Sequence, residues 1–205
     1  MKIRALTTLI AALALAACGE GGPRYLVDSP PSNLRVRAAV STLLVRTVSL
    51  PTYAADEEIA FQDKNGVVKT SNSGLWADDP ERATTLTVTR HLNAMTSAKV
   101  APEPWPLPAP PDGVVDVRIE NFIATNQGTF RISGQYFIGS EVPVQDDIFE
   151  DPDYVPRSLP APLPDRVGIF DIAVALSGDG PSAIAEAQAA ALTRLSEQIA
   201  RDLVR

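Results

Sequence analysis

Two runs of alternating residues, joined by a short turn, constrain the fold of this chain more than any other feature. Residues 114–124, V-V-D-V-R-I-E-N-F-I-A, alternate apolar with polar or charged side chains over most of their length. After Asn126-Gln127-Gly128 the chain returns through residues 129–138, T-F-R-I-S-G-Q-Y-F-I. Period-two alternation is typical of strands that bury one face. The sequence therefore predicts a long hairpin with one face in the core.

Other segments have the composition of strands. Thr42–Val48 is rich in β-branched residues and is ended by Pro51. Asn65-Gly66 separates residues 58–62 from residues 67–70, and because both residues tolerate positive φ this dipeptide predicts a second hairpin. Residues 167–176, V-G-I-F-D-I-A-V-A-L, are so apolar that we expect them to form a central strand.

A first helix is predicted to begin at Asp78-Asp79-Pro80-Glu81 and to end near Thr96. An aspartate caps a helix, proline suits its first turn, and glutamate interacts favourably with the positive end of its dipole. Apolar residues follow at helical spacing: Val88, Leu92 and Met95, with Ala83 and Leu86 nearby. His91 lies in the middle of this helix, where we expect it to be partly exposed.

A second helix is predicted after the turn Ser177-Gly178-Asp179-Gly180, opened by Pro181 and Ser182. Its apolar stripe consists of Ile184, Ala191, Leu192, Leu195, Ile199 and Leu203. Strands in hairpins together with two amphipathic helices favour the α+β class. We expect a small, mostly antiparallel sheet with both helices packed on one face.

The N-terminus has the parts of a secretory signal. Lys2 and Arg4 give it a positive start, residues 5–17 are uncharged, and small residues precede Cys18. A positive start, an apolar segment of roughly 7–15 residues and a small-residue cleavage site define such a signal. A membrane-spanning helix needs about 20 apolar residues, and this run stops at Cys18. We expect a signal peptide at residues 1–17.

Cys18 is the only cysteine of the chain. Leu15-Ala16-Ala17-Cys18 resembles the lipobox of bacterial lipoproteins, in which the cysteine sulfur receives a diacylglyceryl group and the amino terminus freed by cleavage is usually acylated. A lone cysteine closes no internal disulfide, and a nucleophile would need a positioned base. Two or three acyl chains anchor a protein durably, whereas one binds marginally. Gly19 stands where an aspartate commonly retains proteobacterial lipoproteins at the inner membrane, which favours the outer membrane.

These features divide the chain into three parts. The signal peptide is followed by a lipidated N-terminus and tether at residues 18–41 and by a single α+β domain at residues 42–205. The glycines and prolines of the tether resist regular structure, although Tyr25-Leu26-Val27 has the composition of a short strand.

Charge excludes some partners. The chain has 18 basic and 25 acidic residues, a formal charge of −7. Removal of Lys2 and Arg4 with the signal leaves 16 basic residues and a charge of −9. Since no cluster of Lys and Arg is present, the sequence predicts no nucleic-acid partner. Anionic headgroups would also repel such a chain, so membrane contact should come from the lipid anchor.

We expect no catalytic, metal or cofactor site. Residues 139–166 form an acidic, proline-rich loop whose spacing matches no EF-hand, so a solvated loop is favoured over a calcium site. The carboxylates considered as calcium ligands are those of Asp146, Asp147, Glu150, Asp151 and Asp153. A single histidine makes no His-rich site, and Gly178-Asp179-Gly180 lacks the lysine and Ser/Thr of a phosphate loop. The enzymatic alternative, a tethered hydrolase, requires a deep polar pocket with perturbed carboxylates.

Tyr53 and Trp76 are candidate partner-binding residues, because aromatic side chains dominate binding hot spots. The alternative is that both pack beneath loops at the edge of the sheet. Residues 102–111, P-E-P-W-P-L-P-A-P-P, predict an extended, polyproline-like connector. We favour a surface loop with Trp105 packed down over a recognition ligand for another protein.

The order of these segments resembles the ABC-type transport auxiliary lipoprotein family. The lipobox is followed by Tyr25-Leu26-Val27-Asp28, and residues 48–53, V-S-L-P-T-Y, resemble the family pattern Val-x-Leu-Pro-x-Tyr. Leu75-Trp76-Ala77-Asp78 resembles its Trp-Ala-Glu before a helix, although the Pro-Leu that often follows is replaced by Asp79-Pro80. The strand that ends at Phe122 and residues 195–200, L-S-E-Q-I-A, complete the resemblance.

The resemblance implies a non-enzymatic role. Members of the family accompany an ABC transporter and a mammalian-cell-entry-type substrate-binding protein, which together move lipids between the two membranes of a Gram-negative envelope. The chain would be the lipid-anchored docking component at the periplasmic face of the outer membrane, supporting its integrity. A homo-oligomeric ring around a partner's channel is one form of such a component. The alternative is a lipoprotein that regulates or scaffolds cell-wall synthesis or outer-membrane assembly.

Overall fold

The predicted long hairpin forms the centre of the sheet in the computed structural model, which describes residues 22–140 and 163–204. β6 (Gly113–Ala124) and β7 (Thr129–Gly139) pair in antiparallel register from Val114↔Gly139 to Ala124↔Phe130. The register shifts between Ile119 and Asn121. This bulge lets Ile119 and Phe122, three positions apart, both enter the core.

The other strands flank this hairpin and make a mixed sheet of eight strands within the described residues. β8 (Arg166–Ala175) is antiparallel to β7. On the other side, β6 is parallel to both β2 (Thr42–Val45) and β3 (Glu58–Gln62). Three further strands extend the sheet: β5 (Lys99–Pro102) is parallel to β2, β4 (Val68–Trp76) is antiparallel to β3, and β1 (Arg24–Tyr25) is parallel to β4. A short helix, α2 (Thr52–Ala55), connects β2 to β3.

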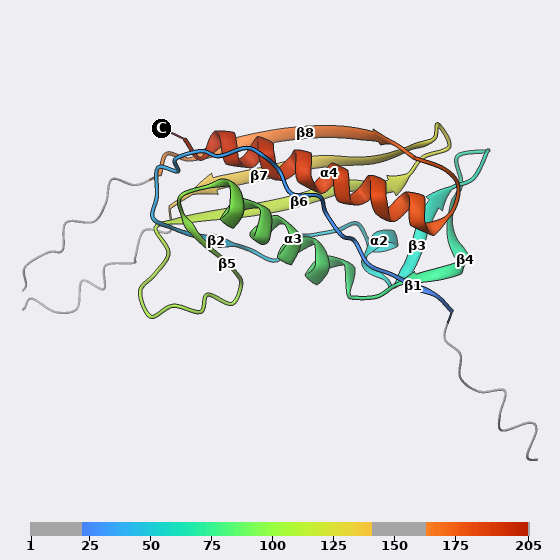
Figure 1. Ribbon diagram of the computed structural model, residues 1–205, viewed down its shortest axis with the longest axis horizontal. Coiled ribbons are helices and arrows are strands. Elements are labelled where there is room, and N and C mark those ends of the chain that lie inside the picture. The colour runs from blue at the N-terminus through green and yellow to red at the C-terminus, as the bar shows by residue number, and fades with distance from the viewer. Residues whose placement is uncertain (1–21, 141–162, 205) are drawn as a thin grey trace, which may run out of the picture.

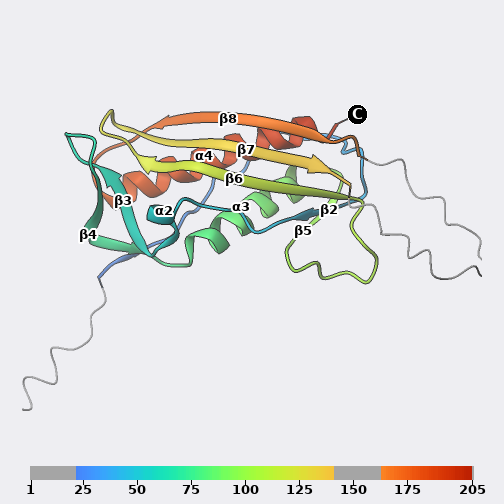
Figure 2. The ribbon, with the colours of Figure 1, turned by 180° about the vertical axis from the view of Figure 1, so that it is seen from behind.

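Both long helices cover the same face of the sheet, which confirms the predicted α+β class. α3 (Pro80–Met95) and α4 (Pro181–Asp202) lie side by side in front of the strands in Figure 1, and Figure 2 shows the opposite face with no helix over it. The Asp79 side chain caps α3 by accepting a hydrogen bond of 2.7 Å from the backbone N–H of Arg82. Neither helix, nor any other in the described part of the chain, is long and apolar enough to cross a membrane.

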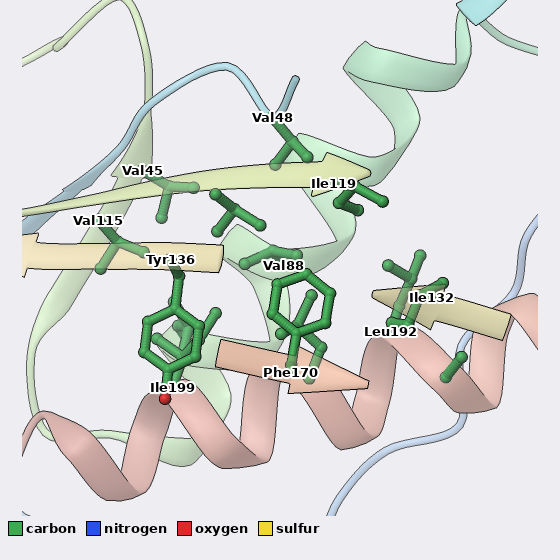
Figure 3. Packing of buried hydrophobic residues seen from close by; sticks show 14 of the residues in the cluster. Val45, Val48, Val88, Val115, Ile119, Ile132, Tyr136, Phe170, Leu192 and Ile199 are labelled. Carbon is green, nitrogen blue, oxygen red and sulfur yellow. The ribbon is translucent and has the colours of Figure 1, made fainter. Parts of the chain in front are cut away.

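The core lies between this helix layer and the sheet (Figure 3). The predicted stripe of α4 is buried along its whole length, and Leu192 and Ile199 contact the inward residues of the strands. Val115 and Tyr136 contribute from β6 and β7. The alternation that predicted the hairpin therefore also identified its core face. Leu86 is an exception among the helix residues that we expected to pack, because it is exposed.

The second predicted hairpin is confirmed as β3–β4, but its turn differs from the expected one. Only Gly66 has positive φ, at 80°, and Asn65 does not. The Asp63 carboxylate accepts hydrogen bonds from the N–H groups of Asn65 and Val67, at 2.9 and 3.0 Å. This side chain organises the turn locally, so only one left-handed residue is required.

The prediction that residues 167–176 form a central strand was wrong, because among the described strands β8 pairs only with β7 and lies at the edge of the sheet. α4 runs along the edge: Gln198 Nε2 donates to the carbonyl of Ile169 at 3.1 Å, and Arg194 Nη1 donates to that of Ala173 at 3.2 Å. Side chains thus satisfy backbone groups that an edge strand would otherwise offer to another chain.

Residues 23–40 cross the outer side of the two helices and are called the strap below (Figure 1). Inward and outward side chains alternate along the strap, with Val27, Leu34 and Val36 packed against the core cluster. Val36 N–H donates to the carbonyl of Met95 at 2.8 Å, and Ala39 N–H donates to that of Leu203 at 2.8 Å. Most of the range predicted as a tether is therefore a third layer over the helices.

The packing of α3 against α4 and the strap explains why the expectation for His91 was wrong. The His91 side chain is buried, and its Nε2 atom lies 3.4 Å from Thr193 Oγ1. The same hydroxyl donates to the carbonyl of Pro30 in the strap at 3.3 Å. Burial lowers the pKa of His91, with a smaller contribution from the charge of Arg90. This side of the helix is closed by a layer that the pattern of α3 alone does not indicate.

Candidate docking surfaces

Trp76 lies at the end of β4, where the strap begins. Its side chain is only 7% exposed, and its backbone N–H donates to the carbonyl of Glu57 at 2.7 Å. What remains accessible lines a groove of about 170 Å³ between the strap and α3. Tyr25, Leu26 and Leu86 add apolar walls, and Leu26 is 72% exposed.

The floor of this groove is polar. Gln188 of α4 is 3% exposed, and its Oε1 atom has no hydrogen-bond partner among the described residues. Asp78 and Arg90 also line the groove. A carbonyl oxygen with two lone pairs and no hydrogen-bond partner is able to accept an N–H or O–H group of a bound molecule. The groove thus combines apolar walls with one buried acceptor.

Tyr53 lies in α2, away from this groove. Its hydroxyl accepts a hydrogen bond of 3.2 Å from the backbone N–H of Phe122, next to the bulge of β6. Its half-buried ring lines a different, shallow depression together with Asp56 and Lys69. Tyr53 and Trp76 therefore line different hollows, and each has a packing role besides any binding role.

A surface that the sequence did not indicate lies on the face of the sheet opposite the helices (Figure 2). Val167 and Ile169 of β8 are 65% and 76% exposed. They are paired with Phe137 and Gln135 of β7, and the guanidinium of Arg118 lies 5.0 Å from the Phe137 ring. The alternation of these residues with Gly168 and Phe170 was the available signal: it divides β8 between two faces.

Charged pairs border this apolar surface. Arg131 binds Asp171 through two hydrogen bonds of 2.8 and 2.7 Å, and Arg118 binds Asp116 at 2.8 Å. The hydrogen bond with Arg131 is the main cause that lowers the pKa of Asp171. An apolar centre with a charged rim is the usual anatomy of a protein interface.

Several predicted features lie outside the described residues: the signal peptide, Cys18 and the acidic carboxylates between positions 146 and 153. In the part of the chain that the structure describes, no three His, Cys, Asp or Glu side chains are grouped to hold a metal ion. The proline-rich segment is a surface loop in which Trp105 is half-buried and donates to the carbonyl of Ala109 at 2.6 Å.

Solved structures share this fold. A crystal structure described as an uncharacterized protein superposes with a TM-score of 0.65 at 17% identity, over 89% of this chain and 98% of the other. A protein from Xanthomonas campestris described under the family name DUF330 gives a TM-score of 0.53 at 16% identity, over 87% and 91% of the two chains. No curated protein matches the sequence.

The sequence itself matches a family model over residues 25–200, from the start of the strap to the last turns of α4. This range includes β2 to β8, the helices α2 and α3, and all of α4 except its last two residues. The chain therefore belongs to the family of ABC-type transport auxiliary lipoprotein components.

Proposed function

We propose that this protein is the non-enzymatic docking component of a mammalian-cell-entry-linked ABC system that transports lipids across the Gram-negative envelope and supports outer-membrane integrity. The family match over residues 25–200 carries the proposal. In it, Cys18 bears the acyl chains, including the palmitate typical of such anchors, and the body lies at the periplasmic face of the outer membrane. The partners are the mammalian-cell-entry-type substrate-binding protein and the transporter subunits.

The chemistry of the described residues favours binding over catalysis. The carboxylates with shifted pKa values, Asp63, Asp171 and Glu197, are all shifted downward, and each has a hydrogen-bond partner that favours its charged form. A general acid requires the opposite, a carboxyl whose pKa is raised toward neutrality. In the described ranges these groups act in ion pairs and turns. This supports a structural role for them and disfavours a tethered hydrolase.

The apolar surface around Val167 and Ile169 is our candidate for docking the mammalian-cell-entry-type subunit. It is exposed, lies on a rigid sheet, and has a rim of paired charges. Trp76 and Tyr53 are second candidates, through the hollows that they line. Apolar side chains at the centre of an interface contribute most of its binding energy.

Capture of the protein from native membranes tests the proposal. We expect the wild-type protein to retain a mammalian-cell-entry-type subunit or a transporter subunit. Ile169→Asp should lose that partner, whereas Ala175→Asp, an exposed position further along the same strand, should keep it. Recovery of a peptidoglycan synthase instead would support the scaffold alternative, and recovery of no transport subunit would contradict the proposed function.

The anchor is tested separately. Mass spectrometry of the protein isolated from cells should find Cys18 as the acylated first residue, and the protein should sediment with outer-membrane fractions. Cys18→Ala should leave it unacylated and release it from those fractions. An unmodified cysteine in the wild-type protein would overturn the anchor.

A further inference from the structure

We propose that the strap fixes how the protein stands on the bilayer: the end of the body that carries β1 and β4 lies at the headgroups, and the end that carries the C-termini of α3 and α4 points away from them. The inference rests on the lipid anchor proposed above and assigns the membrane-facing surface of the body. It follows from where the chain first becomes fixed, how far Cys18 is from that point, and which way the helices run.

The chain is attached to the body from Pro23 onward. The Pro23 carbonyl accepts a hydrogen bond of 3.0 Å from Leu75 N–H, and the Tyr25 carbonyl accepts one of 2.9 Å from Ala77 N–H. The Arg24 guanidinium binds both Glu57, at 2.9 Å, and the carbonyl of Trp76, at 3.1 Å. These contacts hold the beginning of the strap to the end of β4, so the lipid anchor is connected to the body at that end of the sheet.

The distance that the anchor can span is short. Pro23 lies five positions after Cys18 in the sequence. A fully extended chain spans at most about 3.6 Å per residue, so the membrane-anchored residue is within about 18 Å of Pro23. A free tether that continued to residue 41 would reach about 80 Å by the same rule. The strap therefore shortens the stretch of chain that connects the lipid anchor to the folded body.

The helices run away from this point. Both α3 and α4 begin at the end of the body where β1 lies and end near the C-terminus, at the opposite end (Figure 1). At a rise of about 1.5 Å per residue, the 22 residues of α4 extend about 33 Å. This length exceeds the reach of the connection between Cys18 and Pro23. The near end is therefore held beside the headgroups, whereas the far end, with Lys99 and Arg201, can stand up to about 33 Å further out.

The near end offers little electrostatic attraction to a membrane. Arg24 is paired with Glu57, and Arg82 with Asp78. The exposed carboxylates of Asp56 and Asp79 lie in the same region of the chain. Anionic headgroups repel carboxylates within a Debye length of about 8 Å at physiological salt. The short connection thus holds the near end at the bilayer without adsorption, and repulsion between this acidic chain and anionic headgroups favours the orientation in which the far end stands away.

The experiment uses the acylated full-length protein in vesicles of phosphatidylethanolamine and phosphatidylglycerol that contain a headgroup-attached quencher. Acylation blocks the sulfur of Cys18, so a single introduced cysteine is the only free thiol available for a fluorescent label. Ala77→Cys places the label at the near end, and Lys99→Cys places it at the far end; both positions are exposed. We expect strong quenching at position 77 and loss of quenching at position 99.

A variant with 18 Gly/Ser residues inserted between Gly21 and Gly22 is the matched control. It keeps the anchor, the strap and the fold but restores a long connection between Cys18 and the body. The difference in quenching between labels at positions 77 and 99 should therefore disappear. Equal quenching at both positions with the natural spacing would overturn the orientation, provided that the protein floats with the vesicles. A protein that does not float, with unmodified Cys18, would overturn the anchor and this inference with it.

Discussion

The two faces of the sheet differ in how completely they are covered. One face is covered by α3 and α4, and the helices are covered in turn by the strap, so that even His91 and Gln188 are buried. Neither α3 nor α4 covers the other face, which exposes Val167 and Ile169 beside charged pairs (Figure 2). The covered face thus determines stability, whereas the open face is available for interactions. Substitutions on the two faces should therefore have different consequences.

Truncation of a buried leucine should have the largest effect. Leu195 of α4 is fully buried between helix and sheet. We expect Leu195→Ala to lower the free energy of unfolding by about 2–5 kcal/mol, because it removes buried methyl groups and leaves a cavity. Ile169→Ala on the open face should change it by less than about 0.5 kcal/mol. Urea denaturation measures both, and equal losses would contradict the distinction between the faces.

Alkaline pH should weaken the covered face next. Burial, followed by the hydrogen bond to Asp202, raises the pKa of Tyr136 to about 12. Since the unfolded value is about 10, the stabilisation is complete below pH 10 and is lost as the pH rises from 10 to 12. The shift corresponds to at most about 2–3 kcal/mol, because the hydroxyl and its partner Asp202 are only partly buried. The difference in unfolding free energy between the wild type and Tyr136→Phe, measured across this range, should shrink; a constant difference would contradict the assignment.

A single methyl group should disturb the same site. Gly168 of β8 lies opposite Tyr136, and a Cβ atom at position 168 would collide with the tyrosine ring. We expect Gly168→Ala to cost about 1–3 kcal/mol, because the ring must move out of a packed core. Gly178→Ala is the control, since no heavy atom lies within 4 Å of a Cβ there. Thermal denaturation distinguishes the two, and a neutral Gly168→Ala would show that the ring has room to move.

The smallest effect is expected for the ion pairs of the open face. Arg131 and Asp171 are both about half exposed although they form two hydrogen bonds. Exposed pairs contribute about 0.2–1 kcal/mol, and salt weakens them. A double-mutant cycle with Arg131→Ala and Asp171→Ala at low and high salt should give a coupling energy in this range that falls with salt. A larger, salt-independent coupling would mean that this pair is covered.

The sequence predicted those features that depend on neighbours in the chain. The Asp79 cap of α3, the alternation of β6 and β7 and the apolar stripe of α4 all reflect interactions within one element or between two elements joined by a turn. The family resemblance read from short motifs agrees with the match over residues 25–200. Tyr53 and Trp76 were identified as candidates, but the hollows that they line are formed by segments far apart in the sequence.

The sequence by itself determined the hairpins, where the two long helices begin and the apolar stripe of α4, because periodicity and caps are local properties. Only the tertiary structure decided that β8 lies at an edge with Val167 and Ile169 exposed, and that residues 23–40 close over the helices. Both depend on which distant segment occupies the neighbouring position: α4 beside β8, and the strap across His91. An apolar strand has the same pattern in the centre of a sheet or at its edge, and a proline-containing segment becomes ordered only when a groove exists to receive it.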